Sequence, residues 1–132
     1  MTSSSTGAPM TVLLDTHVLL WALAEPEKLN EQRRAILEDG SNACFVSSVS
    51  AAEIAIKASI GKLEFHGDLL EMVNDTGFEW IDFTAVEAVM LRELPFHHRD
   101  PFDRMLVCQA LRRDIPIMTL DANISRYSCK IV

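Results

Sequence analysis

The sequence predicts an α/β protein in which helices cover both faces of a short parallel β-sheet, giving a three-layer α/β/α sandwich. Short strand-like segments alternate with helical segments from about residue 10 to the end of the 132-residue chain. The strand-like segments are apolar and do not alternate with polar residues, which is typical of strands buried on both faces. Hydrophobic residues make up 48% of the chain, enough for one domain with a substantial core.

The first half of the chain is predicted to form two strands and three helices. Their order is strand 12–14, helix 18–24, helix 27–38, strand 43–46 and helix 49–60. The strands are short runs of apolar residues that favour extended backbone. Pro26, Gly40 and Gly61 follow the three helices, and these residue types end helices.

The second half is predicted to continue the alternation. Its order is helix 68–75, a strand within 78–83, helix 84–94, helix 100–113, strand 117–119 and a candidate fifth strand over 130–132. Gly77 and Pro95 end the first two of these helices, and Pro101 opens the third, where its missing N–H costs nothing. No repeat or linker divides the domain.

The charge of the chain limits the classes of function. A net charge of −7 and a pI near 5.0 argue against a protein that coats nucleic acid with a basic surface. Residues 1–90 contain 5 lysines and arginines against 14 acidic residues, whereas residues 91–132 contain 7 against 5. A basic rim is therefore expected from residues 91–132. No apolar run approaches the ~20 residues of a membrane helix, so no membrane association is expected.

Residues 1–9 are predicted to be a flexible leader before a domain over 10–132, with Met10 as a natural start. The leader lacks the positively charged and apolar regions of a signal peptide. The cysteines are odd in number and form no C-x-x-C pair, so neither a disulfide scaffold nor a zinc site is expected. They are Cys44, Cys108 and Cys129. A cytoplasmic location fits best.

Four acidic residues are placed where the chain passes one edge of the predicted sheet. They are Asp15, Glu53, Asp103 and Asp121. Asp15 and Asp121 directly follow strands, whereas Glu53 and Asp103 lie near the starts of helices. Because ligands of open parallel sheets bind at the carboxyl ends of the strands, the four carboxylates can gather in one site.

Each of these acids also has a purely structural interpretation. Asp15 could cap the following helix, and Asp121 could cap a turn. Ser50-Ala51-Ala52-Glu53 matches a capping box, and Asp100-Pro101-Phe102-Asp103 matches an N-cap followed by proline and an acid in the first turn. Taken singly, each acid is better explained as a cap, because acids are common at helix starts.

Helical phase favours a shared site over separate caps. Glu53 is predicted to lie within an inward apolar stripe of Val49, Ala52, Ile56 and Ile60. Asp103 heads a second stripe of Leu106, Val107 and Ala110. Half-buried carboxylates repel one another unless they are neutralised, and the simplest neutraliser is Mg²⁺ or Mn²⁺. A metal held in this way activates water and stabilises charge on a phosphodiester.

Four motifs in order resemble those of the PIN-domain ribonucleases, and among them the VapC-type toxins of bacterial toxin–antitoxin modules. They are Leu13-Leu14-Asp15-Thr16, Ser50-Ala51-Ala52-Glu53, Asp100-Pro101-Phe102-Asp103-Arg104-Met105-Leu106 and Thr119-Leu120-Asp121. The resemblance covers residues 10–132. It implies a compact α/β/α sandwich, a Mg²⁺- or Mn²⁺-dependent endoribonuclease, a homodimer, and inhibition by a small cognate antitoxin.

The resemblance also implies roles for individual residues. Asp15, Glu53, Asp103 and Asp121 match the acidic positions of the family. Asp15, Asp103 and Asp121 are the expected metal ligands, and Glu53 is either a ligand or the group that orients the water. Thr119 matches the hydroxyl position two before the last acid, and the role of Asp100 stays open.

Several other residues have two interpretations. Lys57, Arg99 and Arg104 are candidates for phosphate contacts, yet each could equally be a solvated or ion-paired side chain. The adjacent pair His97-His98 is expected in a solvated loop, and His17 is expected to be a packed helix residue.

A metal-dependent endoribonuclease is the function favoured by the sequence, and two alternatives remain. One is a metal-dependent phosphohydrolase of small phosphate esters, although the D-x-D-x-T motif of the aspartyl-phosphate type is absent. The other is a catalytically idle binding module, which loss of an acid would support, but all four acids are present. The homodimer interface is expected on residues 18–24 and 54–60.

Overall fold

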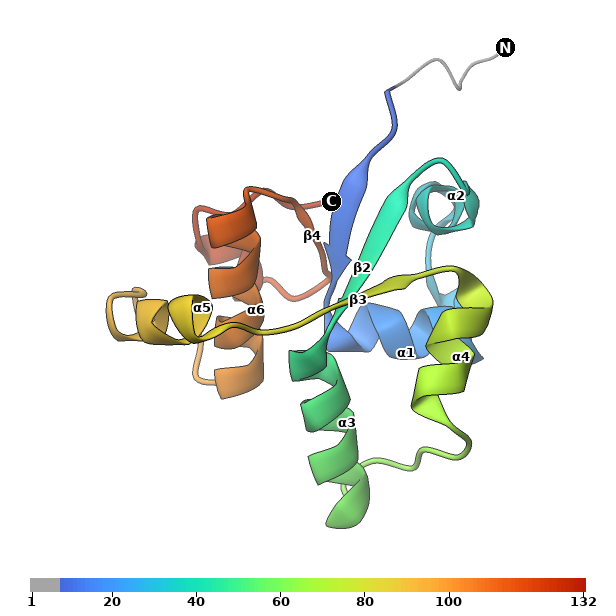
Figure 1. Cartoon of the computed structure of the whole chain (residues 1–132), viewed down its shortest axis with the longest axis horizontal. Helices are drawn as coiled ribbons and strands as arrows, with labels where there is room; N and C mark the ends of the chain where they lie inside the picture. Colours follow the sequence, from blue (N-terminus) through green and yellow to red (C-terminus); the bar gives the residue numbers. More distant parts are fainter. Residues whose placement is uncertain (1–7) are drawn as a thin grey trace.

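The computed structural model describes residues 8–132, and its four parallel strands form one sheet with helices on both faces, as predicted (Figure 1). The strands are β1 (Thr11–Leu14), β2 (Ala43–Ser47), β3 (Glu79–Ile81) and β4 (Ile117–Met118). Their spatial order is β3-β2-β1-β4. Strand β1 is central, with Leu13 opposite Phe45 on one side and Ile117 on the other.

Within residues 8–132, six α-helices connect and cover the strands. They are α1 (Thr16–Ala24), α2 (Glu31–Glu38), α3 (Ser48–Ser59), α4 (Leu69–Thr76), α5 (Ala85–Val89) and α6 (Pro101–Arg113). Short 3₁₀ turns lie at η1 (Pro26–Lys28), η2 (Met90–Arg92) and η3 (Ile124–Arg126). Within residues 8–132, no helix has both the length and the apolar composition needed to cross a bilayer.

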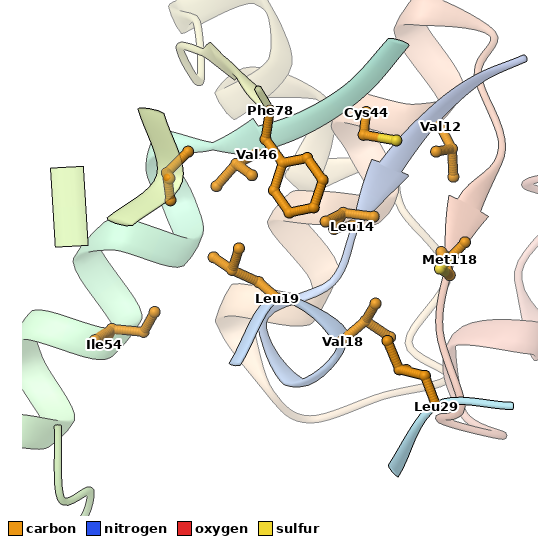
Figure 2. Packing of buried hydrophobic residues seen from close by; sticks show 11 residues of the cluster. Val12, Leu14, Val18, Leu19, Leu29, Cys44, Val46, Ile54, Phe78 and Met118 are labelled. Atoms are coloured by element: carbon orange, nitrogen blue, oxygen red, sulfur yellow. The ribbon is translucent and has the colours of Figure 1, made fainter. Parts of the chain in front are cut away.

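Alternating residues of β1 divide the core into two halves. Val12 and Leu14 face a cluster with Leu19 of α1, whereas Leu13 faces a cluster with Leu106 of α6. Figure 2 shows the first half, with the Phe78 ring lying between Val46 and Leu14. Both faces of the sheet are therefore buried away from solvent, which explains why the strands are uniformly apolar.

The structure differs from the expected elements in three places. The expected helix 27–38 is divided into η1 and α2, because Asn30 caps α2 by accepting a hydrogen bond from the Arg33 amide at 2.8 Å. The expected helix 84–94 is α-helical only to Val89 and continues as η2. The candidate fifth strand contributes one bridge, between Ile117 and Ile131.

The apolar stripe expected on α3 is only partly correct. Val49 and Glu53 are buried together with Ser50 and Ile54, whereas Ile56 and Ile60 are 48% and 60% exposed. The helix projects past the end of the sheet, so the outer side of its second half has no layer to pack against (Figure 1). Glu53 is thus buried, but on a face with polar neighbours.

Part of the predicted leader lies outside the described residues, namely residues 1–7. Ala8 and Pro9 are exposed and have no regular structure. The three cysteines, Cys44, Cys108 and Cys129, are all buried as free thiols.

Candidate active site

A cleft of about 640 Å³ lies where the carboxyl ends of the strands meet the starts of α1, α3 and α6. Its lining includes the four acids singled out in the sequence, together with Asp100 and His98. These acids are Asp15, Glu53, Asp103 and Asp121. The parallel sheet thus brings together carboxylates that lie up to about a hundred residues apart in the chain.

Asp15 both caps α1 and lines the cleft. One carboxylate oxygen, Oδ1, accepts a hydrogen bond from the Val18 amide at 2.7 Å, and Oδ2 accepts one from the Thr119 hydroxyl. Thr119 in turn accepts a hydrogen bond from the Asp121 amide at 3.0 Å. Burial raises the pKa of Asp15, against the hydrogen bonds from Thr119 and Val18. Asp15 is therefore the N-cap of α1 and at the same time part of the cleft lining.

The capping box expected for Glu53 is wrong. Ser47 caps α3 by accepting from the Val49 amide at 3.0 Å, and the Ser50 hydroxyl instead lies 2.9 Å from the Thr16 hydroxyl. Glu53 is only 6% exposed and faces the cleft. Its Oε2 accepts from Lys57 Nζ at 2.6 Å, whereas its buried Oε1 has no partner among the described residues.

Asp103 lies in the first turn of α6 and leads its inward stripe, as predicted. The pKa of Asp103 is raised to about 7, first by burial and then by the negative charges of Asp100 and Glu53. Asp100 is the N-cap, because its Oδ1 accepts from the amides of Phe102 at 2.8 Å and Asp103 at 3.1 Å. The two acids of this motif therefore have different surroundings.

His98 belongs to the site, which corrects the expectation of a solvated loop. Its Nε2 lies 2.9 Å from Asp103 Oδ2 and 2.9 Å from Asp121 Oδ2. The loop before α6 turns the ring inward, and the side chain is only 14% exposed. The signal in the sequence was its position two residues before the Asp100 cap, which places it at the same sheet edge.

The candidate phosphate contacts are dispersed. Lys57 lines the cleft, and so does Lys62, which the sequence reasoning missed. Arg99 is exposed and is not part of the cleft lining. Arg104 is 9% exposed and donates to backbone carbonyls, among them that of Pro95 at 3.0 Å. Arg104 therefore stabilises the fold and does not offer a free cation to a phosphate.

None of the lysines and arginines of residues 91–132, all of which the structure describes, is part of the cleft lining. Arg112 and Arg113 pair with buried Glu87 at 3.4 and 2.8 Å, and Lys130 pairs with Asp114 at 3.3 Å. Within residues 8–132, the cations that line the cleft come from α3 and the turn after it.

The donor set suits a hard divalent cation. Ligand atoms of His98, Asp103 and Asp121 lie within 4.8 Å of one another, and Asp15 and Glu53 line the same cleft. Among the described residues Glu53 Oε1 is an acceptor without a donor, and burial, followed by the charges of Asp100 and Glu53, raises the pKa of Asp103. Both features are those of carboxylates arranged for a cation.

Comparisons with known proteins bear on the fold and the family. The fold is similar to VapBC2 from Rickettsia felis bound to a promoter DNA fragment, with a TM-score of 0.66, 17% identity, and coverage of 93% of this chain and 98% of that chain. It is also similar to DNA-bound VapBC from Salmonella typhimurium, with a TM-score of 0.67, 17% identity and coverage of 93% and 97%.

A third similar structure is VapBC-5 of Mycobacterium tuberculosis, from the VapBC family of toxin–antitoxin systems. Its TM-score is 0.55, its identity 19% and its coverage 94% of this chain and 98% of that chain. No curated protein matches the sequence. The family model for the PIN domain matches residues 12–129, which include all four acids. The chain therefore belongs to the PIN domain family.

Proposed function

We propose that this chain is a divalent-metal-dependent endoribonuclease that acts as the toxin of a toxin–antitoxin pair. The observation that carries the proposal is the convergence of Asp15, Glu53, Asp103 and Asp121 in one cleft. Membership of the PIN domain family and the likeness to VapBC structures support it.

In this proposal the protein supplies metal ligands and a place for the attacking water. Asp15, Asp103 and Asp121 would hold Mg²⁺ or Mn²⁺, and the metal would lower the pKa of a bound water and offset charge on the phosphate. Glu53 Oε1 has no partner among the described residues, so it is free to accept a hydrogen bond from the water. Lys57 holds the other oxygen of Glu53 at 2.6 Å and fixes its orientation.

Lys57 and Lys62 are proposed to contact the phosphates of the substrate. Lys57 is 37% exposed although it is paired with Glu53, and Lys62 is exposed at the cleft. Thr119 contributes indirectly, by holding Asp15 and the Asp121 amide at the ends of β1 and β4. Arg99 is proposed to contact a substrate phosphate at the periphery of the site.

The partner is proposed to be a small antitoxin that covers the cleft with a basic side chain. A cation inserted among these carboxylates would satisfy the same charge that attracts a metal. A homodimer through the outer side of α3 is proposed as well, because Ile56 and Ile60 are exposed. The expected contribution of residues 18–24 is reduced, because Val18 and Leu19 are buried in the core. A cytoplasmic location accords with buried free thiols.

The test is incubation of the purified chain with a total RNA pool, with and without EDTA, followed by mapping of the cut ends. Asp103→Asn is expected to abolish cleavage. Asp100→Asn is the matched control and should lose little activity, because asparagine caps a helix about as well as aspartate. Hydrolysis of nitrophenyl phosphate but not RNA would instead favour the small-ester alternative.

A separate experiment addresses the partner. Expression of the chain alone should arrest growth, and co-expression with the product of an adjacent small reading frame should restore it. A harmless chain that cleaves RNA would keep the nuclease and remove the toxin. A chain that binds a partner but cleaves nothing, with or without metal, would identify the idle binding module.

A further inference from the structure

We propose that His98 is a positioning residue, whose neutral ring donates its Nε2–H to Asp121 and lies against Asp103, and so sets the orientation of these two carboxylates. The inference rests on the proposed metal site, and it assigns His98 a place beside the metal ligands and not among them. It follows from the hydrogen bonds at the two nitrogens of the ring.

The Nδ1 atom of His98 accepts a hydrogen bond from the backbone amide of Asp100 at 3.2 Å. An imidazole nitrogen that accepts a hydrogen bond carries no proton, so the single proton of the neutral ring lies on Nε2. Nε2 is the atom at 2.9 Å from the Oδ2 atoms of both Asp103 and Asp121. The Nε2–H is thus donated to Asp121, and Asp103 Oδ2 lies within ion-pair distance of the same nitrogen.

The same hydrogen bond argues against His98 as a metal ligand. Coordination through Nε2 requires the proton to move to Nδ1, where it would point at the N–H of Asp100. In that arrangement the Nδ1–H of His98 and the backbone N–H of Asp100 are two donors facing each other, and the Asp100 N–H loses its acceptor. A doubly protonated ring would face the same conflict. The neutral Nε2–H form is the one that satisfies both hydrogen bonds of the ring.

The loop that carries His98 is fixed by buried groups. The Tyr127 hydroxyl accepts from the backbone amides of His97 and His98, both at 3.1 Å, and Tyr127 is 6% exposed. Arg104 donates to the same hydroxyl at 3.2 Å and to the Pro95 carbonyl at 3.0 Å. Arg104, which offers no cation to the cleft, thereby holds the loop that places His98.

Removal of the imidazole should loosen both carboxylates, because Asp121 loses a hydrogen bond and Asp103 loses a polar neighbour at 2.9 Å. Asp121 keeps a second anchor, because its Oδ1 accepts from the Asn123 amide at 2.8 Å. Partners that orient metal ligands typically contribute 10- to 100-fold to metal affinity. His98→Ala is therefore expected to weaken Mn²⁺ binding about tenfold or more. His98→Gln should recover most of this loss, since its amide can donate from a similar position.

The experiment begins with the metal-free chain labelled with ¹⁵N. Two-bond ¹H–¹⁵N correlations of His98 are expected to show the Nε2–H tautomer, and an Nδ1–H pattern would overturn the proposal. This measurement involves neither metal nor RNA, so its outcome is separate from that of the proposed nuclease activity, which the wild-type cleavage assay decides. It also requires no variant to fold.

The second measurement uses Mn²⁺ alone as the probe. Free Mn²⁺ is titrated by electron paramagnetic resonance for the wild type, His98→Ala and His98→Gln, with His66→Ala as the control, since the His66 side chain is 87% exposed. Unchanged affinity in His98→Ala would refute the positioning role. Electron spin echo modulation from a coordinated ¹⁴N that disappears in His98→Ala would show a metal ligand and would likewise overturn the proposal.

Discussion

Asp103→Asn is expected to stabilise the metal-free protein at pH 8. The Asp103 side chain is 17% exposed, and burial followed by the charges of Asp100 and Glu53 raises its pKa from 3.8 to about 7. Between these values the folded chain holds a proton that the unfolded chain has lost. The free energy of unfolding therefore falls as the pH rises toward 7 and stays constant above it.

The structure sets the size of this effect. A factor of ten in proton affinity corresponds to about 1.4 kcal/mol, so the raised pKa gives an upper bound of about 4 kcal/mol. Residual contact with solvent and the repulsion shared among neighbouring acids reduce the expected gain to roughly 1–2 kcal/mol. Asparagine keeps an acceptor for His98, so the variant loses the charge without losing the contact.

The assay is urea denaturation in EDTA at low salt, at pH 5 and pH 8. The stabilisation should be largest at pH 8 and less than half as large at pH 5, where Asp103 of the folded wild type is already protonated. Glu64→Gln removes one negative charge from a side chain that is 86% exposed, and it should change stability by less than about 0.5 kcal/mol. A variant less stable than the wild type at pH 8, or a gain independent of pH, would refute the argument.

Three further outcomes are expected. Mn²⁺ at about 100 times its Kd should add about 2.7 kcal/mol to the free energy of unfolding of the wild type. In a calorimetric scan this should raise the melting temperature by roughly 10 °C, and EDTA should reverse the shift. Glu53→Gln should keep the fold by circular dichroism but lose RNA cleavage, because an amide is a poor acceptor for a water proton; full activity would exclude Glu53 from the chemistry. Arg104→Ala should lower the free energy of unfolding by about 2–4 kcal/mol, since buried carbonyls lose a charged donor, whereas Arg99→Ala should stay within about 0.5 kcal/mol by the same denaturation assay.

Local pattern was sufficient to predict the strands and two of the acids. Asp15 and Asp103 follow from the ends of an apolar strand and the phase of an amphipathic helix, both of which depend on neighbours in sequence. The phase of α3 was only partly correct because Ile56 and Ile60 extend past the sheet, and helical periodicity does not tell where the adjoining layer stops. The sequence predicts Glu53 in the site from an inward apolar stripe. In the structure Glu53 is buried on a face that it shares with Ser50 and Ile54.

His98 and Arg104 show what sequence pattern leaves out. His98 lies in a loop, where no periodicity applies, and Arg104 lies in the first turns of α6. Their contacts reach residues such as Tyr127 and Asp121 that are more than twenty positions away. The sequence predicts for Arg104 a phosphate contact, or a solvated or ion-paired side chain. Its burial depends on backbone carbonyls of a tight loop, which become acceptors only after the loop has folded.

The small number of cations that line the cleft determines how this protein would hold RNA. Lys57 is already paired with Glu53, and Lys62 is the other lysine of the cleft lining. A protein that neutralises about two phosphates releases few counterions, so its affinity should fall gently with salt, with a logarithmic slope of about −1 to −2. Backbone charge then contributes little to affinity at physiological ionic strength. Discrimination among RNAs would depend on the shape of a strand that can bring a phosphate to the carboxylates, and product release would be fast.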